Sequence, residues 1–301
     1  QLVRELEIDI AVDLTGYTAH ARTGILAYRP APVQVNFLGY PGTLGADYVD
    51  YLVADRFVVP EDCRRFYAEQ VVYLPDTYQP RDDALAIAEP APSRAEAGLP
   101  EHGFVFCCFN SLHKITPPVF AIWMRLLHRV AGSVLWLLEG EPAAMAHLRD
   151  HAAAHGVAGE RLVFAPRQPI EQHLARHRCA DLFLDTLPYN AHTTASDALW
   201  AGLPLLTCAA PSGFAGRVAG SLLHAAGLPE LVTFSLADYE ALARRLADEP
   251  QRLRALREKL GRARKAAPLF DTARFCRHLE QAYDTMSQRR QRGEPPAAFA
   301  L

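Results

Sequence analysis

Two short apolar runs, each followed by a polar loop that opens a helix, constrain the fold more than any other feature. The first run, residues 104–109, leads into a loop that contains Lys114, and the second, residues 180–185, leads into the loop 187–194. Runs this short and this apolar, with helical patterns between them, are typical of strands buried on both faces of a parallel sheet. Because the carboxyl ends of parallel strands lie at one edge of the sheet, we expect the two loops to meet there.

The chemistry of the two loops predicts a diphosphate site. A lysine ammonium such as that of Lys114, about 4 Å from a phosphate oxygen, contributes roughly 4 kcal/mol at an effective dielectric near 20. The second loop opens a helix around Thr193 and Thr194, where unpaired N–H groups attract anions by on the order of 0.3–2 kcal/mol. The sequence contains no Asp-x-Asp pair, the carboxylate arrangement that commonly holds a divalent ion on a nucleotide diphosphate. We therefore expect a diphosphate site that needs no metal ion.

Each of these residues also has a simpler interpretation when it is taken alone. A lone loop lysine such as Lys114 is most often a solvated surface charge. Thr193 or Thr194 is most simply an N-cap, and Asp197 in a first helical turn is favoured by the helix dipole. His173 and His192 are each as easily a surface or core residue as a ligand. The expected convergence of the loops is what favours a binding site.

Composition excludes several other classes of protein. The net charge is −3 with 31 lysines and arginines, too balanced for adhesion to nucleic acid or an anionic membrane. No apolar run approaches the roughly 20 residues of a membrane span, and no secretion signal opens the chain, so we expect a cytoplasmic protein. The six cysteines form no C-x-x-C pair and are expected to be free and mostly buried. Neither G-x-G-x-x-G nor G-x-x-x-x-G-K-[ST] occurs, which disfavours dinucleotide dehydrogenases and P-loop ATPases.

The pattern along the chain predicts an α/β protein with three regions. Apolar runs predict strands at residues 8–12, 33–38, 51–53, 71–74, 104–109, 133–138, 162–164, 180–185 and 205–208. Helices are expected between the early strands and at residues 119–130, 143–155, 170–179, 194–201 and 237–286. Four prolines between residues 80 and 100 suit a connection between lobes. We expect a first lobe over 1–92, a second lobe over 93–268, and a C-terminal helix over 269–301 that packs back across the lobes.

The sequence closely resembles a known family over residues 8–286. The segments that carry the resemblance are Leu14–Thr18, Arg29–Gln34, Leu38–Thr43, Asn110–Lys114, Ser133–Leu138, His192–Thr194 with Asp197, Leu199–Gly202 and Pro204. They resemble the catalytic region of protein O-linked N-acetylglucosamine transferases, glycosyltransferase family 41. The resemblance implies a GT-B architecture of two Rossmann-like lobes, with a first lobe that is incomplete in this chain. It also implies metal-independent, inverting transfer from UDP-N-acetylglucosamine to serine or threonine hydroxyls of proteins, with UDP-sugar as donor substrate and no cofactor.

The resemblance assigns the diphosphate and the ribose to residues of the second lobe. Lys114 would neutralise the departing diphosphate as the catalytic cation. The side chain of His192 and the backbone of Thr193 and Thr194 would hold the same group. Asp197 would bind the ribose.

The resemblance also places the base and the sugar. His173 would lie against the uracil, whose edge would be read by main-chain groups of Arg167 and Gln168. Leu38 and Gly39 would border the sugar in the first lobe, where glycine allows close approach.

Some residues of the sugar and acceptor side depart from the family pattern. Tyr17 and Arg22 would face the acceptor. Animal members have a cysteine where Tyr189 stands and a tyrosine where His113 stands, so the donor could differ from UDP-N-acetylglucosamine. His20 is a local candidate for the base, but relatives have glycine there and we interpret it as a surface residue. The family also has tetratricopeptide repeats and further first-lobe sequence upstream, and we expect the natural gene to begin well before Gln1.

Three functions from different classes therefore stay open. The first is a UDP-sugar-dependent protein O-glycosyltransferase. The second is a relative with another donor or acceptor, such as a GDP-fucose O-fucosyltransferase, an N-linking glucosyltransferase or a sugar-nucleotide epimerase. The third is a UDP-binding fragment or scaffold without turnover.

Overall fold

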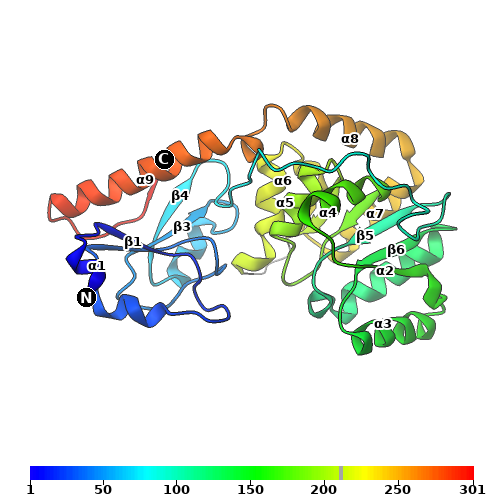
Figure 1. The fold of residues 1–301 in the computed structure, drawn as a ribbon, viewed down its shortest axis with the longest axis horizontal. Coiled ribbons are helices and arrows are strands. Elements are labelled where there is room, and N and C mark those ends of the chain that lie inside the picture. The colour runs from blue at the N-terminus through cyan, green and yellow to red at the C-terminus, as the bar shows by residue number, and fades with distance from the viewer. Residues whose placement is uncertain (210–212) are drawn as a thin grey trace. The chain divides into compact units, whose positions relative to one another are not determined.

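Two parallel sheets organise the chain, one in each of two units (Figure 1). The computed structural model describes residues 1–209 and 213–301. Unit 1 comprises Gln1–Arg81, Gly213–Ala215 and Asp271–Leu301, and unit 2 comprises the described residues between them. The first boundary between the units falls after Arg81, ahead of the boundary expected after residue 92.

Unit 1 is built on a five-stranded sheet in the order β1-β2-β3-β4-β11. Its strands are β1 (Ile10–Asp13), β2 (Val33–Asn36), β3 (Tyr51–Asp55), β4 (Gln70–Leu74) and β11 (Phe299–Ala300). All neighbours pair in parallel, so β1 to β4 confirm the predicted early strands. The last strand, β11, was not predicted, because its two residues follow prolines rather than an apolar run.

The connections of unit 1 differ from the prediction of intervening helices. The segments between strands contain only 3-10 turns, η1 (Thr23–Tyr28) and η2 (Glu61–Phe66), besides the short helix α1 (Leu2–Glu5) before β1. The sequence explains why no long helix forms in these segments. Prolines break the interior of a helix, and Pro30, Pro32 and Pro60 stand where a longer helix would have to continue. The expectation of α-helices here was wrong.

The C-terminal helix α9 (Thr272–Gln291) belongs to unit 1 and packs against β2 and β4 (Figure 1). Asp271 caps it by accepting a hydrogen bond of 2.8 Å from the N–H of Arg274. The guanidinium of Arg274 pairs with Asp76 at 2.8 Å. Ala282 and Met286 are the buried residues of the helix, so its apolar side contributes to the core of unit 1.

Unit 2 is built on a six-stranded parallel sheet in the order β10-β9-β8-β5-β6-β7. Its strands are β5 (Val105–Cys108), β6 (Val134–Leu138), β7 (Leu162–Ala165), β8 (Leu182–Leu184), β9 (Leu205–Cys208) and β10 (Val232–Thr233). The chain leaves β5 toward β6 on one side and leaves β8 toward β9 on the other. The strand order therefore reverses between β5 and β8, and in open α/β sheets ligands bind at the carboxyl ends of strands at such a switch point.

The helices of unit 2 largely match the predicted pattern. They are α2 (Pro117–Arg129), α3 (Pro142–Ala154), α4 (Ile170–Arg176), α5 (Thr193–Trp200), α6 (Val218–Ala225), α7 (Leu236–Asp248) and α8 (Pro250–Ala263). Short 3-10 turns complete the unit: η3 (Leu112–Lys114), η4 (Gly159–Arg161), η5 (His177–Cys179), η6 (Phe214–Gly216, shared with unit 1), η7 (Pro229–Leu231) and η8 (Pro268–Phe270). The predicted helical stretch 237–286 is divided into α7, α8 and α9 at Pro250 and Pro268. Helix α6 was missed because seven of its eight residues are buried, so it lacks a polar face.

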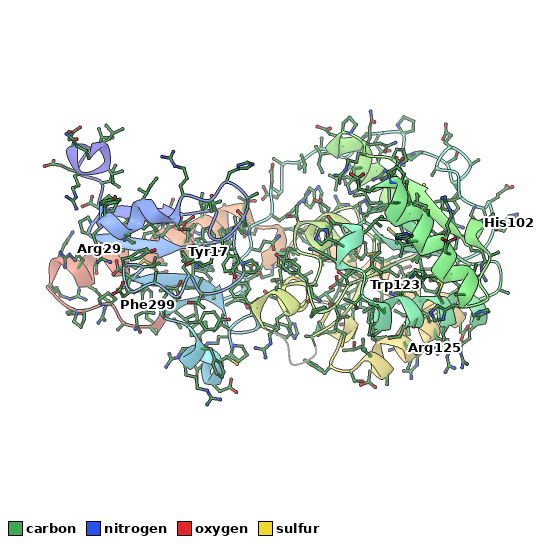
Figure 2. The ribbon with its side chains drawn as sticks, turned by 90° about the horizontal axis from the view of Figure 1, so that it is seen from below. Tyr17, Arg29, His102, Trp123, Arg125 and Phe299 are labelled. Atoms are coloured by element: carbon green, nitrogen blue, oxygen red, sulfur yellow. The ribbon has the colours of Figure 1, made fainter. Side chains whose placement is uncertain are left out.

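A polar link joins helices α2 and α7 to the sheet of unit 2. Trp123 lies inside the unit whereas Arg125 of the same helix lies at its surface (Figure 2). The indole N–H of Trp123 donates to the hydroxyl of Tyr239 at 3.1 Å, and that hydroxyl donates to the carbonyl of Asp185 at 3.0 Å. The link ends at the carboxyl edge of β8.

The proline-rich segment after residue 81 is attached to unit 2. The indole of Trp200 donates to the carbonyl of Leu85 at 3.0 Å. Further along, Arg94 pairs with Asp181 at 2.7 Å. These contacts explain why the boundary between the units precedes this segment.

Two further findings concern predictions made from composition. None of the six cysteines, all of which lie in the described residues, forms a disulfide, and four of them are buried. No helix within residues 1–209 and 213–301 combines the length and the apolar character that crossing a lipid bilayer requires.

A substitution at Gly103 would test how closely the backbone packs in unit 2. The φ of Gly103 is +109°, and a Cβ added there would lie 2.3 Å from the carbonyl oxygen of Gly132. Gly103→Ala should therefore lower the free energy of unfolding by about 1–3 kcal/mol, measured by urea denaturation of the full-length protein. The control is Gly261→Ala in α8, where a Cβ meets nothing within 4 Å; alanine there should stabilise the helix by up to about 1 kcal/mol. Equal effects of the two substitutions would contradict this account.

Candidate functional site

The two loops that were expected to meet are joined by Asn110, which is buried at the carboxyl end of β5. Its side-chain amide donates to Asp185 at 3.3 Å and to the hydroxyl of Thr186 at 2.7 Å, both at the end of β8. Its side-chain oxygen accepts a hydrogen bond from the hydroxyl of Thr194 in the first turn of α5. One side chain therefore fixes the first loop against the second and against the start of α5.

Lys114 lies at this junction, as the last residue of η3. Its ammonium donates to the carbonyl of Asn190 at 3.1 Å and lies 4.1 Å from the ring centroid of Tyr189. Burial lowers the pKa of Lys114, and the charge of Asp185 acts in the opposite direction. Within the described residues, Lys114 forms no ion pair with a carboxylate within 4.0 Å. Its charge is therefore available to an anion bound at the loop.

Asp185 shapes the second loop and was missed as a functional candidate. Its carboxylate accepts hydrogen bonds from the N–H groups of Thr186 at 2.7 Å and Ala191 at 2.6 Å, and from the hydroxyl of Thr207 at 2.6 Å. Burial raises the pKa of Asp185 to about 7, against the effect of these hydrogen bonds and of Lys114. The signal in the sequence was a single aspartate at the end of an apolar run, which does not reveal what it contacts.

The start of α5 carries the other predicted diphosphate residues. His192 occupies the N-cap position, and its ring stacks on that of Tyr189 with 4.8 Å between centroids. Thr193 is exposed as the first helical residue, and the hydroxyl of Thr194 bonds to Asn110. Neither threonine is therefore the N-cap. The structure brings both of them, His192 and Tyr189 into one region with Lys114.

Asp197 is a buried residue of α5, beyond its first turn. The simple interpretation of Asp197 as a first-turn acidic residue is therefore wrong. The whole residue is 5 % exposed. A carboxylate in such a position is costly unless polar groups satisfy it, which favours a specific role over a solvated charge.

His173 lies on α4 and is tied to the first loop through Phe109, with 5.2 Å between ring centroids. Its Nδ1 accepts a hydrogen bond of 2.5 Å from Arg176, and its carbonyl accepts one of 2.8 Å from His177. Burial lowers the pKa of His173 to about 4, and the charges of Arg176 and Arg167 act in the same direction. The ring is therefore a neutral imidazole with its proton on Nε2, held in one orientation.

Arg167 and Gln168 are exposed residues of the loop that follows β7. This loop also leaves the carboxyl edge of the unit 2 sheet, and it leads directly into α4 and His173. The predicted role of Arg167 and Gln168 depends on their main-chain groups, which lie in this loop at the carboxyl edge of the sheet.

The sugar-side and acceptor-side residues belong to unit 1. Leu38 and Gly39 follow β2, and Tyr17 follows β1, so all three lie at the carboxyl edge of that sheet. The hydroxyl of Tyr17 donates to the carbonyl of Leu44 at 2.7 Å. Arg22 is the residue before η1, and His20 is exposed, as expected for a surface residue.

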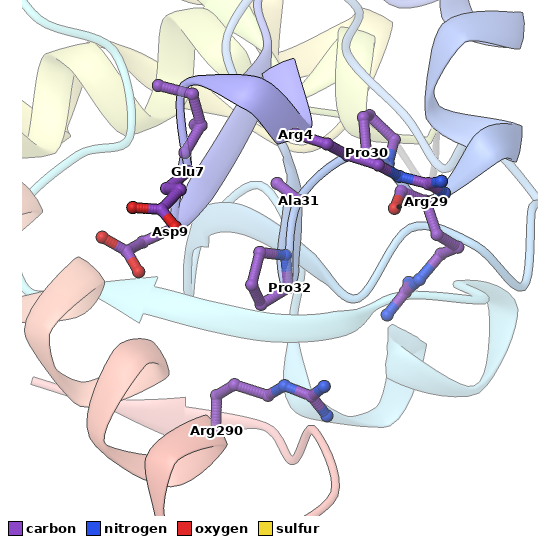
Figure 3. A pocket seen from close by; sticks show the side chains of 9 residues that line it. Arg4, Glu7, Asp9, Arg29, Pro30, Ala31, Pro32 and Arg290 are labelled. Carbon is purple, nitrogen blue, oxygen red and sulfur yellow. Dashed lines mark hydrogen bonds between the residues drawn. The ribbon is translucent and has the colours of Figure 1, made fainter. Parts of the chain in front are cut away.

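A pocket of about 460 Å³ in unit 1 lies away from these residues (Figure 3). Its charged lining consists of Arg4, Glu7, Asp9, Arg29 and Arg290. Asp9 directly precedes β1, so the pocket lies at the amino edge of the sheet, opposite the predicted residues. In the described parts of the chain, no three histidine, cysteine, aspartate or glutamate side chains are grouped so that they could hold a metal ion.

Comparison with known proteins places this geometry in a family. Residues 1–89 and 82–279 match the profile described as glycosyl transferase family 41. The probable UDP-N-acetylglucosamine–peptide N-acetylglucosaminyltransferase SEC of Arabidopsis thaliana is 39 % identical over 307 residues, which cover 100 % of this chain and 31 % of that protein. The UDP-N-acetylglucosamine–peptide N-acetylglucosaminyltransferase of Caenorhabditis elegans is 28 % identical over 96 % of this chain and 35 % of its own length. The chain thus spans about a third of these relatives.

Solved structures agree with this assignment. A mutant O-GlcNAc transferase of Thermobaculum terrenum superposes with a TM-score of 0.87 and 35 % identity, over 96 % of this chain and 55 % of that one. Anabaena HepE, solved with UDP and glucose, has a TM-score of 0.63 and 16 % identity, over 95 % of this chain and 80 % of its own, which shows a shared fold alone. The two α/β units are therefore lobes of the GT-B fold, as the sequence implied. The chain belongs to glycosyltransferase family 41.

Proposed function

We propose that the protein transfers N-acetylglucosamine from UDP-N-acetylglucosamine to serine or threonine hydroxyls of proteins, with inversion and without a metal ion or other cofactor. The observation that carries this proposal is the ammonium of Lys114, which lies beside the start of α5 without a carboxylate partner among the described side chains. A cation and main-chain N–H groups at one point suit a diphosphate leaving group. The names of the relatives in Arabidopsis and Caenorhabditis support the same donor and a peptide acceptor.

The proposed reaction would use that arrangement. The acceptor oxygen forms a bond to the anomeric carbon while the bond from that carbon to the diphosphate oxygen breaks on the opposite face, and the hydroxyl proton passes to water. Negative charge grows on the β-phosphate as the bond breaks. Lys114 and the N–H groups of Thr193 and Thr194 would stabilise that charge, and His192 would hold the same phosphate. Because they are fixed in advance, they act without reorganisation.

The nucleoside would be bound along the same edge of unit 2. Asp197 would accept hydrogen bonds from the ribose, and the neutral ring of His173 would lie flat against the uracil. Main-chain groups of Arg167 and Gln168 would pair with the edge of the base. A flat polar ring is well matched to an immobile imidazole and to backbone donors and acceptors.

Unit 1 would supply the sugar and acceptor side. Leu38 and Gly39 would border the sugar, and Tyr17 and Arg22 would face the acceptor protein. An upstream segment with tetratricopeptide repeats is part of the proposal as the region that receives protein substrates. The buried thiols, which form no disulfide, are compatible with the proposed cytoplasmic location.

One contact favours a second candidate function, which is the same architecture with another donor. The ring of Tyr189 lies under Lys114 and against His192, where animal members of the family have a cysteine. A bulkier residue there could change the preferred sugar or nucleotide. Competition between UDP and GDP for the protein would separate a UDP-sugar enzyme from a GDP-sugar enzyme. UDP binding without any glycosylated product in the full-length protein would favour a binding protein.

Lys114→Ala should lower kcat by about 10²–10³-fold, because the lost charge acts mainly as the glycosidic bond breaks. A sugar-transfer assay with a protein acceptor measures the change. Lys259→Ala is the matched control, since Lys259 lies in the same unit in a surface ion pair with Glu230 at 2.6 Å. The control should keep wild-type activity. An unchanged rate for Lys114→Ala would remove this residue from the mechanism.

Asp197→Ala should weaken UDP binding about 10- to 100-fold, as expected when hydrogen bonds to a charged acceptor worth about 1.5–3 kcal/mol are lost. Isothermal calorimetry with UDP measures the effect. Asp197→Asn keeps one oxygen acceptor and should retain more of the affinity. If calorimetry gave the wild-type dissociation constant for Asp197→Ala, the ribose assignment would be wrong.

His173 should stay neutral well below the pH at which histidines usually titrate. Its pKa of about 4 lies below the ordinary value of 6.5, so the unfolded chain binds a proton that the folded chain does not. The folded protein therefore loses stability as the pH falls from about 6.5 toward about 4, and His173 has no such effect above that window. Urea denaturation at pH 7 and pH 5 should show a smaller acid loss for His173→Gln than for wild type.

The control for this measurement is His20→Gln, at an exposed histidine of unit 1. It should show the same acid loss as wild type. An NMR titration of the His173 imidazole provides a direct check, and a midpoint near 6.5 would contradict the buried, neutral ring.

A further inference from the structure

The loop after β2 contains a strained turn at Leu38. The φ of Leu38 is +70°, and the N–H of Gly39 donates to the carbonyl of Phe37 at 2.9 Å. A hydrogen bond across three residues with positive φ at the centre is the rare and strained form of the γ-turn. A non-glycine residue keeps such a conformation only where its surroundings enforce it.

A neighbouring loop confines this turn from one side. A Cβ added to Gly39 would lie 1.9 Å from the carbonyl oxygen of Leu14, so the two backbones are in direct contact. The hydroxyl of Tyr17 donates to the carbonyl of Leu44 at 2.7 Å. The rings of Tyr17 and Tyr40 pack edge to face with 5.5 Å between centroids. The loops after β1 and β2 therefore form one packed group.

A buried carboxylate, that of Glu69, also holds the loop after β2 through hydrogen bonds. Glu69, which directly precedes β4, is 3 % exposed. It accepts hydrogen bonds from the hydroxyl of Thr43 at 2.5 Å, from the N–H of Leu44 at 2.6 Å and from the side-chain amide of Asn36 at 3.4 Å. The amide of Asn36 also donates to the carbonyl of Gly42 at 2.9 Å. In the described parts of the chain no Lys, Arg or His forms an ion pair with Glu69.

The hydroxyl of Thr43 connects Glu69 to two backbone N–H groups nearby. The hydroxyl oxygen accepts hydrogen bonds from the N–H of Gly45 at 2.9 Å and from the N–H of Ala68 at 3.2 Å. Because the same hydroxyl donates to Glu69, one side chain links the end of the loop to the chain that enters β4. A neutral acceptor in place of the carboxylate would weaken the strongest of these bonds, since hydrogen bonds to charged groups are about twice as strong as neutral ones.

We propose that Glu69 is a positioning residue of the transfer reaction: it holds the loop 38–45 so that Leu38 and Gly39 keep the backbone conformation in which they border the donor sugar. This inference rests on the proposed function. Glu69 touches no reacting atom in this scheme and acts only through Thr43, Leu44 and Asn36. Misplacement of such a border by about 1 Å can cost about 10²-fold in rate.

The test is Glu69→Gln in the full-length protein. It should lower kcat/KM for sugar transfer about 10- to 100-fold while the dissociation constant of UDP, measured by calorimetry, stays within about twofold, because the nucleotide residues belong to unit 2. Hydrogen exchange of the amides of residues 39–44 should become faster. Wild-type kcat/KM in a stable Glu69→Gln protein would overturn the inference.

Asp50→Asn is the matched control for loss of stability. Asp50 is a largely buried carboxylate of the same unit that accepts a hydrogen bond from the N–H of Gln34 at 2.8 Å and pairs with Arg29 at 2.8 Å. Asp50 directly precedes β3 as Glu69 directly precedes β4, but its carboxylate accepts hydrogen bonds from Arg29 and Gln34 rather than from the loop 38–45. Asp50→Asn should lower stability without changing kcat/KM at a temperature where the protein is folded. An equal kinetic loss in both variants would mean that Glu69 is merely structural.

A second pair keeps the proposal testable if Glu69→Gln does not fold. Thr43→Val removes the hydroxyl that reaches Glu69, whereas Thr43→Ser retains it. The valine variant should show the lower kcat/KM with unchanged UDP affinity, and the serine variant should restore the wild-type value. Equal activity of the two variants would overturn the inference. A wild-type protein that transfers no sugar would instead refute the proposed function.

Discussion

The candidate site depends on one buried side chain, Asn110, at the switch point of the unit 2 sheet. Its amide and its carbonyl oxygen together reach Asp185, Thr186 and Thr194. Lys114 and Thr116 add further hydrogen bonds from the first loop to the carbonyls of Asn190 and Leu187 in the second, and Asn110 adds the bond to the start of α5. The convergence that distinguishes a binding site from scattered polar residues is therefore enforced by hydrogen bonds in the core, where an unsatisfied amide would be costly.

Most of the fold was predictable because its strands are short apolar runs that are separated by polar turns and helical patterns. The runs before Lys114 and before Thr186 became β5 and β8, and their neighbours became a parallel sheet. What escaped prediction had no local signal. Strand β11 consists of two residues that pair with β4, which is far away in the sequence, and seven of the eight residues of α6 are buried. The α-helices expected between the strands of unit 1 are replaced by short 3-10 turns.

The predicted site residues divide in the same way. The positions of Lys114, Thr193 and Thr194 beyond the carboxyl ends of β5 and β8 could be predicted from the sequence, because each follows an apolar run. The roles of Asp185 and Glu69 could not be predicted, because each is a single acidic residue in the sequence. Their roles depend on hydrogen-bond donors that lie elsewhere in the chain. The carboxylates that shape the loops are therefore visible only in the structure.

These two carboxylates have similar roles in the two units, since each holds a loop through hydrogen bonds. Asp185 takes its hydrogen bonds from Thr186, Ala191 and Thr207, and Glu69 takes its bonds from neutral groups as well. A salt bridge could also fix a loop, but it would neutralise the cation that took part in it. Because Asp185 is satisfied by neutral donors, it can order the loop beneath Lys114 and still leave that ammonium to an incoming anion. Its negative charge meanwhile raises the pKa of Lys114 against the effect of burial, which favours the charged form that a departing diphosphate requires.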